Sequence, residues 1–375
     1  MCLSGGPVSR AIRRVVSYYA RPKSFATGGV NASSQEWMRA FAQQGIEVKI
    51  VYAQGGYDQR LVSDSNLRYA GLRHFGKSRM TMIPMGLGEQ IDRADLVYLH
   101  EGWTPSNAIA AAICRLKSVP YVVMPHGVYD RRIAKRQALY GLRRRVEGAV
   151  LRGALAVHLF FDSERTDVLA INSRARTFTA MTGMDLPDSR WKPRPGRGYI
   201  AWLARFDIQH KGIDLLLHAM ARIPAGARPM LRMCGPDHRG DKVRVEAMVA
   251  EKGLSGSVSV EGELRGNDVQ KFLLASDAFI HTPRWESFGQ AVAEAAALGV
   301  PMVLSESANI TSRLSAAQAA VAVKPDCSDL DEALSYLFLH ASSMSAAALK
   351  WSQDNLDWSN AAQRALVGLG AARDS

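Results

Sequence analysis

Two glutamates, Glu286 and Glu294, have a spacing that suggests ligand chemistry. Residues 278–280 are apolar and, together with His281, predict a buried strand, while residues 290–298 are strong helix formers followed by Gly299. Glu286 therefore lies in a strand-to-helix loop, and Glu294 lies inside the helix. Because an ionised carboxylate only accepts hydrogen bonds, the pair suits a ligand rich in hydroxyl groups, such as a sugar or a ribose.

The start of this helix adds backbone donors beside the carboxylates. Ser287, Phe288 and Gly289 lead into it, and N–H groups at a helix N-terminus can face a negative oxygen or a hydroxyl. The alternative is that Glu286 only stabilises the helix terminus and that Glu294 faces solvent.

Two cations follow another predicted strand. Residues 199–204 are apolar, and Arg205 and Lys211 flank the short loop before the next helical pattern. Arg presents a planar fork and Lys a compact charge, so the two can straddle a pyrophosphate. Ligands of open α/β sheets bind beyond the carboxyl ends of the strands, where both cations are expected. A solvated surface loop is the alternative.

Further candidates also follow predicted strands. His126 comes shortly after the apolar run 122–124, Gly28 and Gly29 follow the first predicted strand, and Gly235 follows residues 230–234. Glycines at such positions let the backbone approach a phosphate closely. A satisfied structural histidine and flexible turns are the alternatives.

Together, these segments resemble family 4 of the glycosyltransferases, which transfer a sugar from a nucleotide sugar with retention at the anomeric carbon. The resemblance is spread over residues 12–370 and rests on four motifs: Gly28-Gly29, Pro125-His126-Gly127, Arg205 with Lys211, and Glu286 with Glu294, which seven residues separate.

The resemblance implies an α/β protein of the GT-B fold, with two Rossmann-like doubly wound parallel-sheet domains facing a cleft. It implies a UDP- or GDP-linked sugar as donor, with no metal and no cofactor. Arg205 and Lys211 would stabilise the departing diphosphate. Glu286 would hold the sugar hydroxyls with His126 near the reacting carbon, and Glu294 would bind the ribose.

The chain departs from the family pattern at two places. Residues 181–185 read Met-Thr-Gly-Met-Asp where the family usually has Pro-Asn-Gly before an Asp, so only Gly183 matches. Residues 282–285 read Thr-Pro-Arg-Trp where Pro-Ser is common. Both departures concern contacts to the substrates. No zinc-spaced set of His and Cys is evident.

At 375 residues the chain is long for a single core, so two domains are expected. The Pro-rich stretch 187–195 reads as the linker between two patterned halves. We expect an acceptor-side domain over residues 1–186 and a nucleotide-sugar-binding domain over residues 187–350. In the resembling family the last helix crosses back to the first domain, and residues 351–375 would do so here.

Strand-like and helix-like runs alternate in both halves, which predicts parallel sheets covered by helices. The expected strands are 14–19, 47–52, 95–100, 121–124, 154–161, 199–204, 230–234, 258–262, 278–281, 301–304 and 321–324. The expected helices include 33–44 with Ser33 or Ser34 as N-cap, 105–116, and residues 330–370 throughout.

The net charge of +12 lies entirely in residues 1–185, which contain 26 Lys and Arg against 14 Asp and Glu. Much of it gathers after His126 in a basic patch: Arg131, Arg132, Lys135, Arg136, Arg143, Arg144, Arg145 and Arg152. Leu139, Leu142, Val146 and Val150 recur at helical spacing, so the segment predicts a basic amphipathic helix.

Three kinds of partner could match the basic patch. An anionic membrane surface or a lipid-linked, pyrophosphate-bearing acceptor is favoured, because each Lys or Arg near such a surface adds about 1 kcal/mol of attraction. Nucleic acid is not expected, since no known RNA- or DNA-binding motif accompanies the charge. A solvated helix that packs its apolar stripe on its own domain is the structural alternative.

The sequence predicts a cytoplasmic protein, with peripheral association at the inner face of the membrane as an option. No apolar stretch is long enough to span a bilayer, and the N-terminus lacks an apolar signal region. The four cysteines, Cys2, Cys114, Cys234 and Cys327, form no CxxC pair and predict reduced thiols.

The leading hypothesis is a glycosyltransferase that builds a cell-surface polysaccharide or lipopolysaccharide on a lipid-linked saccharide. A glycosyltransferase with a soluble small-molecule acceptor is the second. A basic nucleic-acid-binding protein on a Rossmann-like scaffold would leave the acidic motif without a purpose. A dinucleotide-dependent oxidoreductase is disfavoured, because no Gly-x-Gly-x-x-Gly follows the first strand.

Overall fold

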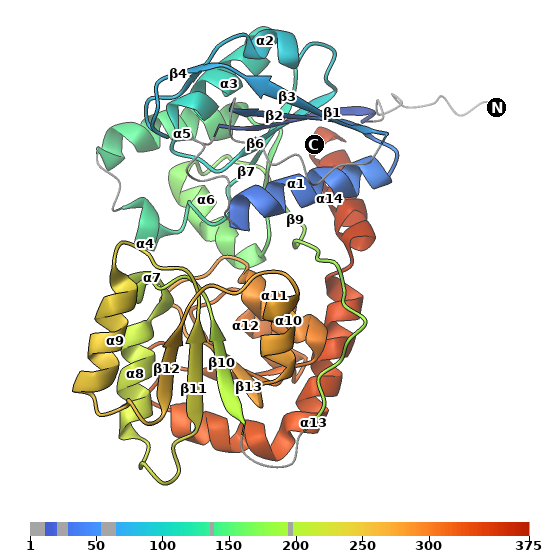
Figure 1. Ribbon diagram of the computed structural model, residues 1–375. Helices are drawn as coiled ribbons and strands as arrows, with labels where there is room; N and C mark the ends of the chain where they lie inside the picture. The colour runs from blue at the N-terminus through green and yellow to red at the C-terminus, as the bar shows by residue number, and fades with distance from the viewer. Residues whose placement is uncertain (1–11, 21–28, 54–64, 136–138, 194–197, 375) are drawn as a thin grey trace, which may run out of the picture. The chain divides into compact units, whose positions relative to one another are not determined.

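The structure is a computed structural model that describes residues 12–20, 29–53, 65–135, 139–193 and 198–374. The chain divides into two compact units. The first unit comprises residues 1–183 together with 358–375, and the second comprises residues 184–357. Each unit is an α/β structure built on a parallel sheet, the class that the alternation of strands and helices predicts (Figure 1).

Seven parallel strands form the sheet of the first unit, in the spatial order β3-β2-β1-β6-β7-β8-β9. They are β1 (Arg14–Tyr19), β2 (Glu47–Ala53), β3 (Leu67–Leu72), β6 (Leu96–His100), β7 (Tyr121–Met124), β8 (Ala156–Leu159) and β9 (Thr177–Thr179). The order in which successive strands are added reverses between β1 and β6: β2 and β3 extend the sheet toward one edge, and β7, β8 and β9 extend it toward the other. Strands β6, β7 and β8 are buried along their whole length, as in sheets covered on both faces.

Helices cover both faces of this sheet. Figure 1 shows α1 (Gly29–Gln43) and α14 (Trp358–Asp374) on one side, and α2 (Leu87–Gln90) and α3 (Pro105–Leu116) on the other. Helix α14 packs against α1 and β9, so the end of the chain completes the first unit. The remaining elements are β4 (His74–Phe75), β5 (Ile83–Pro84), α4 (Arg131–Ala134), α5 (Tyr140–Gly153), the 3-10 turn η3 (Asp162–Glu164) and α6 (Arg165–Ile171).

Helix α1 begins earlier than the sequence predicts. Ser33 and Ser34 are not N-caps, because the helix starts at Gly29 and both lie inside it. The Ser34 hydroxyl donates a hydrogen bond to the Asn31 carbonyl within the helix. A Ser side chain can form hydrogen bonds to nearby backbone groups both at an N-cap and inside a helix. The presence of Ser alone therefore does not determine where a helix starts.

Six parallel strands form the sheet of the second unit, in the order β12-β11-β10-β13-β14-β15. They are β10 (Tyr199–Leu203), β11 (Met230–Cys234), β12 (Val258–Glu261), β13 (Ala278–His281), β14 (Met302–Ser305) and β15 (Ala320–Val323). The order in which successive strands are added reverses between β10 and β13. The core beneath the sheet contains Trp202, Phe206, Leu216, Leu231 and Ile280.

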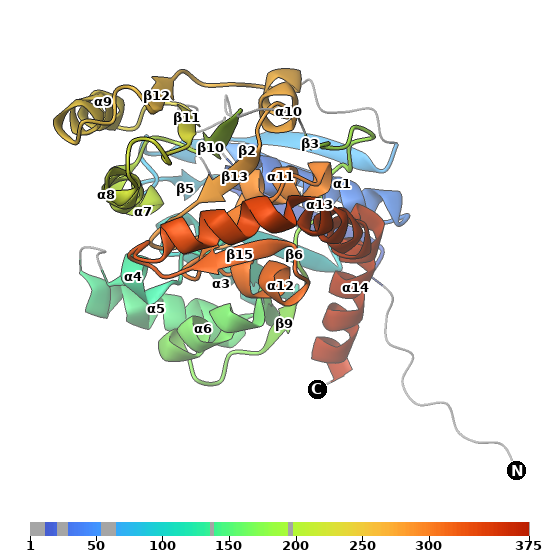
Figure 2. The ribbon, with the colours of Figure 1, turned by 90° about the horizontal axis from the view of Figure 1, so that it is seen from below.

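The helices of the second unit are α7 (Ile208–Lys211), α8 (Ile213–Arg222), α9 (Asp241–Glu251), α10 (Asn267–Leu274), α11 (Gln290–Leu298), α12 (Thr311–Ala316) and α13 (Leu330–Asn355). Figure 2 shows α13 running past β15 and α11, against which it packs. The predicted continuous helix over residues 330–370 is wrong in one respect. It breaks at Leu356 and Asp357, where the chain leaves the second unit and α14 begins.

The Pro-rich stretch 187–195 is only partly a linker. Trp191 is buried in the second unit, where its backbone N–H donates to the Leu298 carbonyl at 2.7 Å and its indole N–H donates to the Ser276 carbonyl at 2.7 Å. Apolar burial and two satisfied donors therefore attach this segment to the unit that follows it.

Candidate active site

The cationic and the acidic motifs of the second unit follow the two strands at which the sheet order reverses. Arg205 comes two residues after β10, and Glu286 comes five residues after β13. Loops that leave adjacent strands at such a reversal diverge to opposite faces, and ligands of open α/β sheets bind beyond the strand ends at this point. The fold thus places both motifs at the ligand-binding edge of the sheet.

Lys211 and Glu286 form an ion pair at this edge. The Lys211 ammonium donates a hydrogen bond to Glu286 Oε2, and their side chains are only 11% and 15% exposed. His281, the last residue of β13, contacts the same oxygen through Nε2 at 3.2 Å. Because a carboxylate can only accept, His281 carries its proton on Nε2.

The charge of Glu286 depends on the groups around it. Burial disfavours the charged form of Glu286, but the Lys211 ammonium and the His281 hydrogen bond outweigh burial and hold the pKa of this carboxyl well below its usual value. Burial, followed by the charge of Lys211, lowers the pKa of His210 to about 4. Lys211 has three N–H donors, so Glu286 leaves it able to donate to a further anion.

A glycine brings the two loops together. Gly212 follows Lys211 with φ of 61°, and a Cβ atom there would lie 2.2 Å from the Thr282 carbonyl oxygen. Only glycine tolerates both the left-handed conformation and this approach. The loop after β13 can therefore lie close enough to α7 for Glu286 to reach Lys211.

Arg284 fastens the same two loops. Its guanidinium makes two hydrogen bonds of 2.7 Å to the carboxylate of Asp214, and its backbone N–H donates to the His210 carbonyl at 2.9 Å. The neighbouring Trp285 stacks on the His210 ring, with 4.7 Å between centroids and 11° between planes. We refer to Arg284 and Asp214 as the loop clasp.

Arg205 lies in the same loop as Lys211 but is turned toward a different group. Its Nη2 atom is 3.0 Å from Asp207 Oδ2 and 3.4 Å from His210 Nδ1, and the side chain is 44% exposed. Asp207 also caps α7, since it accepts a hydrogen bond from the His210 backbone. The structure therefore places Arg205, Lys211 and Glu286 around His210 within one unit.

The acidic motif continues into α11, whose predicted bounds, 290–298, are confirmed. Gly289 precedes the helix with φ of 76°, and Phe288 is buried beside it. Ser287 lies in the same loop. Glu294 is half-buried in the second turn of the helix, where burial raises its pKa to about 7. This carboxyl is not the solvent-facing residue of the alternative interpretation.

Gly235 permits another close approach. A Cβ atom at this position would lie 1.8 Å from the Ala204 carbonyl oxygen, so the chain after β11 passes directly against the chain after β10. The Gly235 N–H donates to the Gly262 carbonyl at 3.1 Å, and Pro236 has no N–H. A diphosphate would therefore find no backbone donor at these two positions.

His126 of the first unit lies two residues beyond β7, in a left-handed backbone conformation with φ of 52°. Its Nε2 atom is 3.0 Å from His100 Nδ1, and its ring makes an edge contact with Phe160. Gly29 is the first residue of α1. Gly28, the other member of the predicted pair, lies outside the described residues.

Both halves of the chain match glycosyltransferase family models. Residues 188–349 match the model described as Glycosyl transferases group 1, and residues 28–181 match the model described as Glycosyl transferase 4-like domain. The chain is a glycosyltransferase. No curated protein sequence matches it.

Solved structures show the same fold as this glycosyltransferase at low sequence identity. Sucrose-phosphate synthase from Thermosynechococcus elongatus has a TM-score of 0.74 at 19% identity, covering 94% of this chain and 97% of its own. Anabaena HepE in complex with UDP has a TM-score of 0.77 at 14% identity, covering 96% and 100%. WaaG, a glycosyltransferase involved in lipopolysaccharide biosynthesis, has a TM-score of 0.66 at 16% identity, covering 94% and 98%.

With its two parallel-sheet units, the glycosyltransferase has the GT-B fold that the sequence motifs predict. Within the described residues, no helix combines the length and apolar character that crossing a bilayer requires. No group of three or more His, Cys, Asp or Glu side chains in that part of the chain could hold a metal ion.

The basic patch of the glycosyltransferase is divided between two helices, α4 and α5, and Arg136 lies outside the described residues. Arg131 and Arg132 pair with Asp167 and Asp130. Arg143 donates to the Trp103 carbonyl at 3.0 Å. The remaining members, Lys135, Arg144, Arg145 and Arg152, are exposed.

The structural alternative, in which the apolar stripe of this segment packs on its own domain, is wrong for three of its four members. Leu139, Leu142 and Val146 are 76%, 60% and 45% exposed, and only Val150 of the four is buried. The buried side of α5 instead carries Glu147, to which the Tyr129 hydroxyl and the Trp103 backbone donate hydrogen bonds. A carboxyl group with two hydrogen-bond donors can occupy a position in the interior, which hydrophobic spacing does not reveal.

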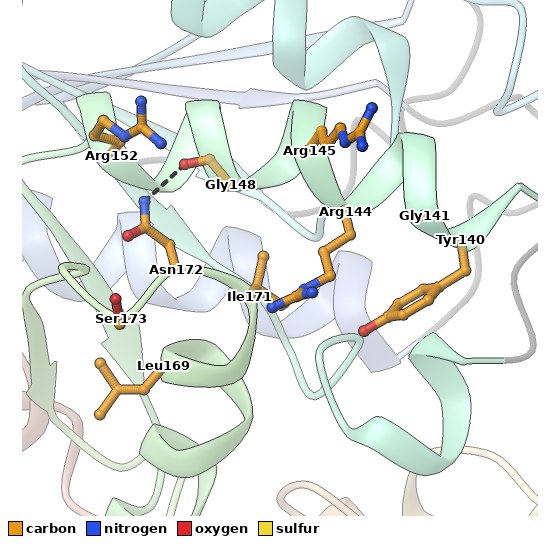
Figure 3. A pocket seen from close by; sticks show the side chains of 10 residues that line it. All are labelled: Tyr140, Gly141, Arg144, Arg145, Gly148, Arg152, Leu169, Ile171, Asn172 and Ser173. Atoms are coloured by element: carbon orange, nitrogen blue, oxygen red, sulfur yellow. Dashed lines mark hydrogen bonds between the residues drawn. The ribbon is translucent and has the colours of Figure 1, made fainter.

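A hollow of about 730 Å³ lies between α5 and the end of α6 (Figure 3). Its lining is Tyr140, Gly141, Arg144, Arg145, Gly148, Arg152, Leu169, Ile171, Asn172 and Ser173, and none of these is acidic. Figure 3 shows Arg145 and Arg152 on one side of α5 and Arg144 turned toward Ile171. Arg144 donates to the Ala170 carbonyl at 2.7 Å, and Asn172 donates to the Gly148 carbonyl at 2.7 Å. We call this hollow the arginine groove.

Several site residues were not singled out from the sequence. The sequence predicts His281 only as the end of a strand, and it does not predict the loop clasp. The position of His281 at the end of β13, beside the point where the strand order reverses, is the signal that could have identified it. The clasp joins residues 70 positions apart, and no local pattern indicates such a pair.

Proposed function

We propose that this glycosyltransferase moves a sugar from a nucleoside-diphosphate sugar, linked to UDP or GDP, to a saccharide acceptor with retention at the anomeric carbon. The favoured acceptor is a lipid-linked saccharide in the synthesis of a cell-surface polysaccharide or lipopolysaccharide. Arg205 and Lys211 stabilise the departing diphosphate. Glu286 binds the sugar hydroxyls, and Glu294 binds the ribose. His126 contacts the transferred sugar, as the family resemblance implies.

The observation that carries this proposal is the Lys211–Glu286 pair at the sheet edge where ligands bind. An almost enclosed ammonium beside a carboxylate offers a donor to a phosphate oxygen and an acceptor to a hydroxyl within one site. A nucleotide sugar presents both groups close together, because only the glycosidic oxygen and the anomeric carbon lie between its phosphorus and the carbon of the nearest hydroxyl. HepE, solved with UDP, with UDP and glucose, and with UDP-glucose, gives the same donor class further support.

The transfer requires one bond to break and one to form at the anomeric carbon. The electron pair of the bond from this carbon to the diphosphate passes to the diphosphate oxygen, and an acceptor oxygen bonds to the carbon from the same face. The acceptor hydroxyl gives its proton to the leaving diphosphate. Arg205 and Lys211 stabilise the negative charge that grows on the leaving oxygen, and no metal or cofactor enters these steps.

The full-length protein can be tested with thermal shift and hydrolysis across UDP- and GDP-linked sugars. A bound nucleotide stabilises the folded state, by about 2.7 kcal/mol at a concentration a hundredfold above Kd. We expect one base to raise Tm and its sugar nucleotide to be hydrolysed to the retained anomer, as read by NMR at early times. Absence of stabilisation by every nucleotide would refute the proposed donor class, and an inverted product would refute retention.

A further inference from the structure

Three side chains from neighbouring strands of the first unit form a connected hydrogen-bonded series. Ser17 Oγ lies 2.9 Å from His100 Nε2, and His100 Nδ1 lies 3.0 Å from His126 Nε2. The series runs across adjacent parallel strands, since Ser17 belongs to β1, His100 ends β6 and His126 follows β7. Ser17 and His100 are buried, and His126 is half-buried.

His100 is neutral in this setting. Burial lowers its pKa to about 3, and the nearby His158 contributes in the same direction. The rings of Tyr98 and Tyr19 lie against it. The carboxylate of Glu101, the residue that follows His100, pairs with Arg79 at 3.2 Å and accepts a hydrogen bond from the Tyr19 hydroxyl.

A neutral imidazole has one N–H, so the series can point in only two directions. If His100 donates from Nδ1 to His126, its Nε2 accepts the Ser17 hydroxyl proton, so the Ser17 hydroxyl and both nitrogens of His100 are satisfied. If His100 instead donates from Nε2 to Ser17, the buried hydroxyl proton of Ser17 needs another acceptor. Among the described residues Ser17 Oγ has no hydrogen-bond partner except His100. An unmade hydrogen bond of a buried donor costs about 1–3 kcal/mol.

We infer that Ser17 and His100 are positioning residues that fix the tautomer of His126, with its Nε2 as acceptor and its proton on Nδ1. This inference rests on the proposed function only for its consequence. If His126 contacts the transferred sugar, it presents an N–H donor to a sugar oxygen and not a lone pair to a sugar hydroxyl. A third buried histidine in the same region, His158, is bound to the Ala180 carbonyl through Nε2 and takes no part in the series.

The tautomer can be read directly in the full-length protein. Selective ¹⁵N-histidine labelling and long-range ¹H–¹⁵N correlation distinguish Nδ1–H from Nε2–H rings, and the spectrum of His126→Gln assigns the His126 signals. We expect the Nδ1–H pattern for His126. We expect Ser17→Ala to shift it toward Nε2–H and Ser17→Thr to restore the original pattern. Ser106→Ala is the matched control, because it removes another buried hydroxyl of the first unit, bound to Thr104.

Activity provides the second readout. Ser17→Ala should lower kcat roughly tenfold with little change in donor KM, since it disturbs a hydrogen bond to the reacting sugar. An Nε2–H ring in the wild type, or a Ser17→Ala spectrum like that of Ser106→Ala, would overturn the inference. If the tautomer is as inferred but His126→Gln keeps full activity, the proposed role of His126 fails while the positioning series stands.

Discussion

Lys211 and Glu286 are both nearly enclosed by protein, and Glu286 is stable in its charged form because Lys211 lies beside it. Removing one partner of a buried pair leaves an uncompensated charge, which costs about 3–5 kcal/mol. Removing Lys211 should also lower turnover independently of stability, since Lys211 is proposed to stabilise the leaving diphosphate.

We therefore expect Lys211→Ala to lower turnover by at least roughly a hundredfold and to destabilise the fold by about 3 kcal/mol. The double variant Lys211→Ala/Glu286→Gln should regain much of the stability but none of the turnover. Urea unfolding and initial rates with the cognate sugar nucleotide measure the two effects. Unchanged turnover in Lys211→Ala would remove the proposed role of the lysine.

Glu294 has a raised folded-state pKa of about 7, because burial disfavours its charged form. A group of this kind contributes stability that is complete below its unfolded pKa and is lost as pH rises through the folded pKa. Between pH 5 and pH 8 the wild type should lose up to about 3 kcal/mol that Glu294→Gln does not lose.

Chemical denaturation across this pH range, without nucleotide, compares the wild type with Glu294→Gln. Glu251→Gln, at the exposed end of α9, is the control for removal of a carboxylate. Parallel stability curves for the wild type and Glu294→Gln would show that Glu294 titrates normally. A ribose-binding role further predicts weaker nucleotide binding in Glu294→Gln.

At the scale of elements, the loop clasp decides whether the two site loops stay together. Arg284 and Asp214 connect the loop after β13 to the start of α8, with two hydrogen bonds of 2.7 Å. We expect Arg284→Gln to lower kcat about tenfold, because a small displacement of Glu286 from Lys211 disturbs the proposed alignment.

Asp214→Asn should have a similar effect, and the double variant should be no worse than either single one, because all three remove the same interaction. Lys350→Gln is a suitable control, since it removes an exposed ion pair with Asp354 in the same unit. Additive losses in the double variant would show that Arg284 and Asp214 act independently.

Gly212 is the second element-scale requirement for the site. We expect Gly212→Ala to destabilise the protein by about 1–3 kcal/mol, because the new methyl group meets the Thr282 carbonyl and the left-handed backbone is strained. Gly256→Ala is the matched control, since its position in the same unit is open. Equal unfolding midpoints for the two variants would mean that the loops move apart without cost.

At the scale of the whole molecule, the uneven charge distribution is the main unassigned property. The arginine groove has no acidic lining residue, and exposed Leu139, Leu142 and Val146 belong to the same helix or precede it. From these exposed arginines beside exposed apolar side chains we propose a phosphate-rich amphiphilic surface as the partner of α5, and not nucleic acid.

Sedimentation with anionic phosphatidylglycerol vesicles tests this assignment. Two arginines contribute about 1 kcal/mol each, so Arg145→Gln/Arg152→Gln should weaken vesicle binding by at least roughly tenfold at low salt. The control variant Arg13→Gln/Arg165→Gln removes the same charge from exposed positions elsewhere in the first unit, and it should change vesicle binding little. Equal losses in both variants would indicate diffuse charge, and salt-insensitive binding would argue against the membrane.

The sequence alone predicted the elements that have a clear local signal. The strands at 14–19, 121–124, 230–234 and 278–281 and the helices at 105–116 and 290–298 have the predicted bounds, because short apolar runs bounded by turn residues fix them. Strands β3 and β9 were missed. Both are edge strands with partly exposed side chains, so neither carries a continuous apolar run.

The motif residues were likewise predicted from their types and the family resemblance, but their contacts within the fold were not. Only the tertiary structure shows that Lys211 is bound to Glu286, that Arg284 fastens the two loops, and that His100 lies behind His126. The reason is physical: these contacts form across the carboxyl edges of parallel strands, whose spatial order a linear pattern does not contain. A sequence specifies which strands exist, whereas the order of strands in the sheet decides which of their loops meet.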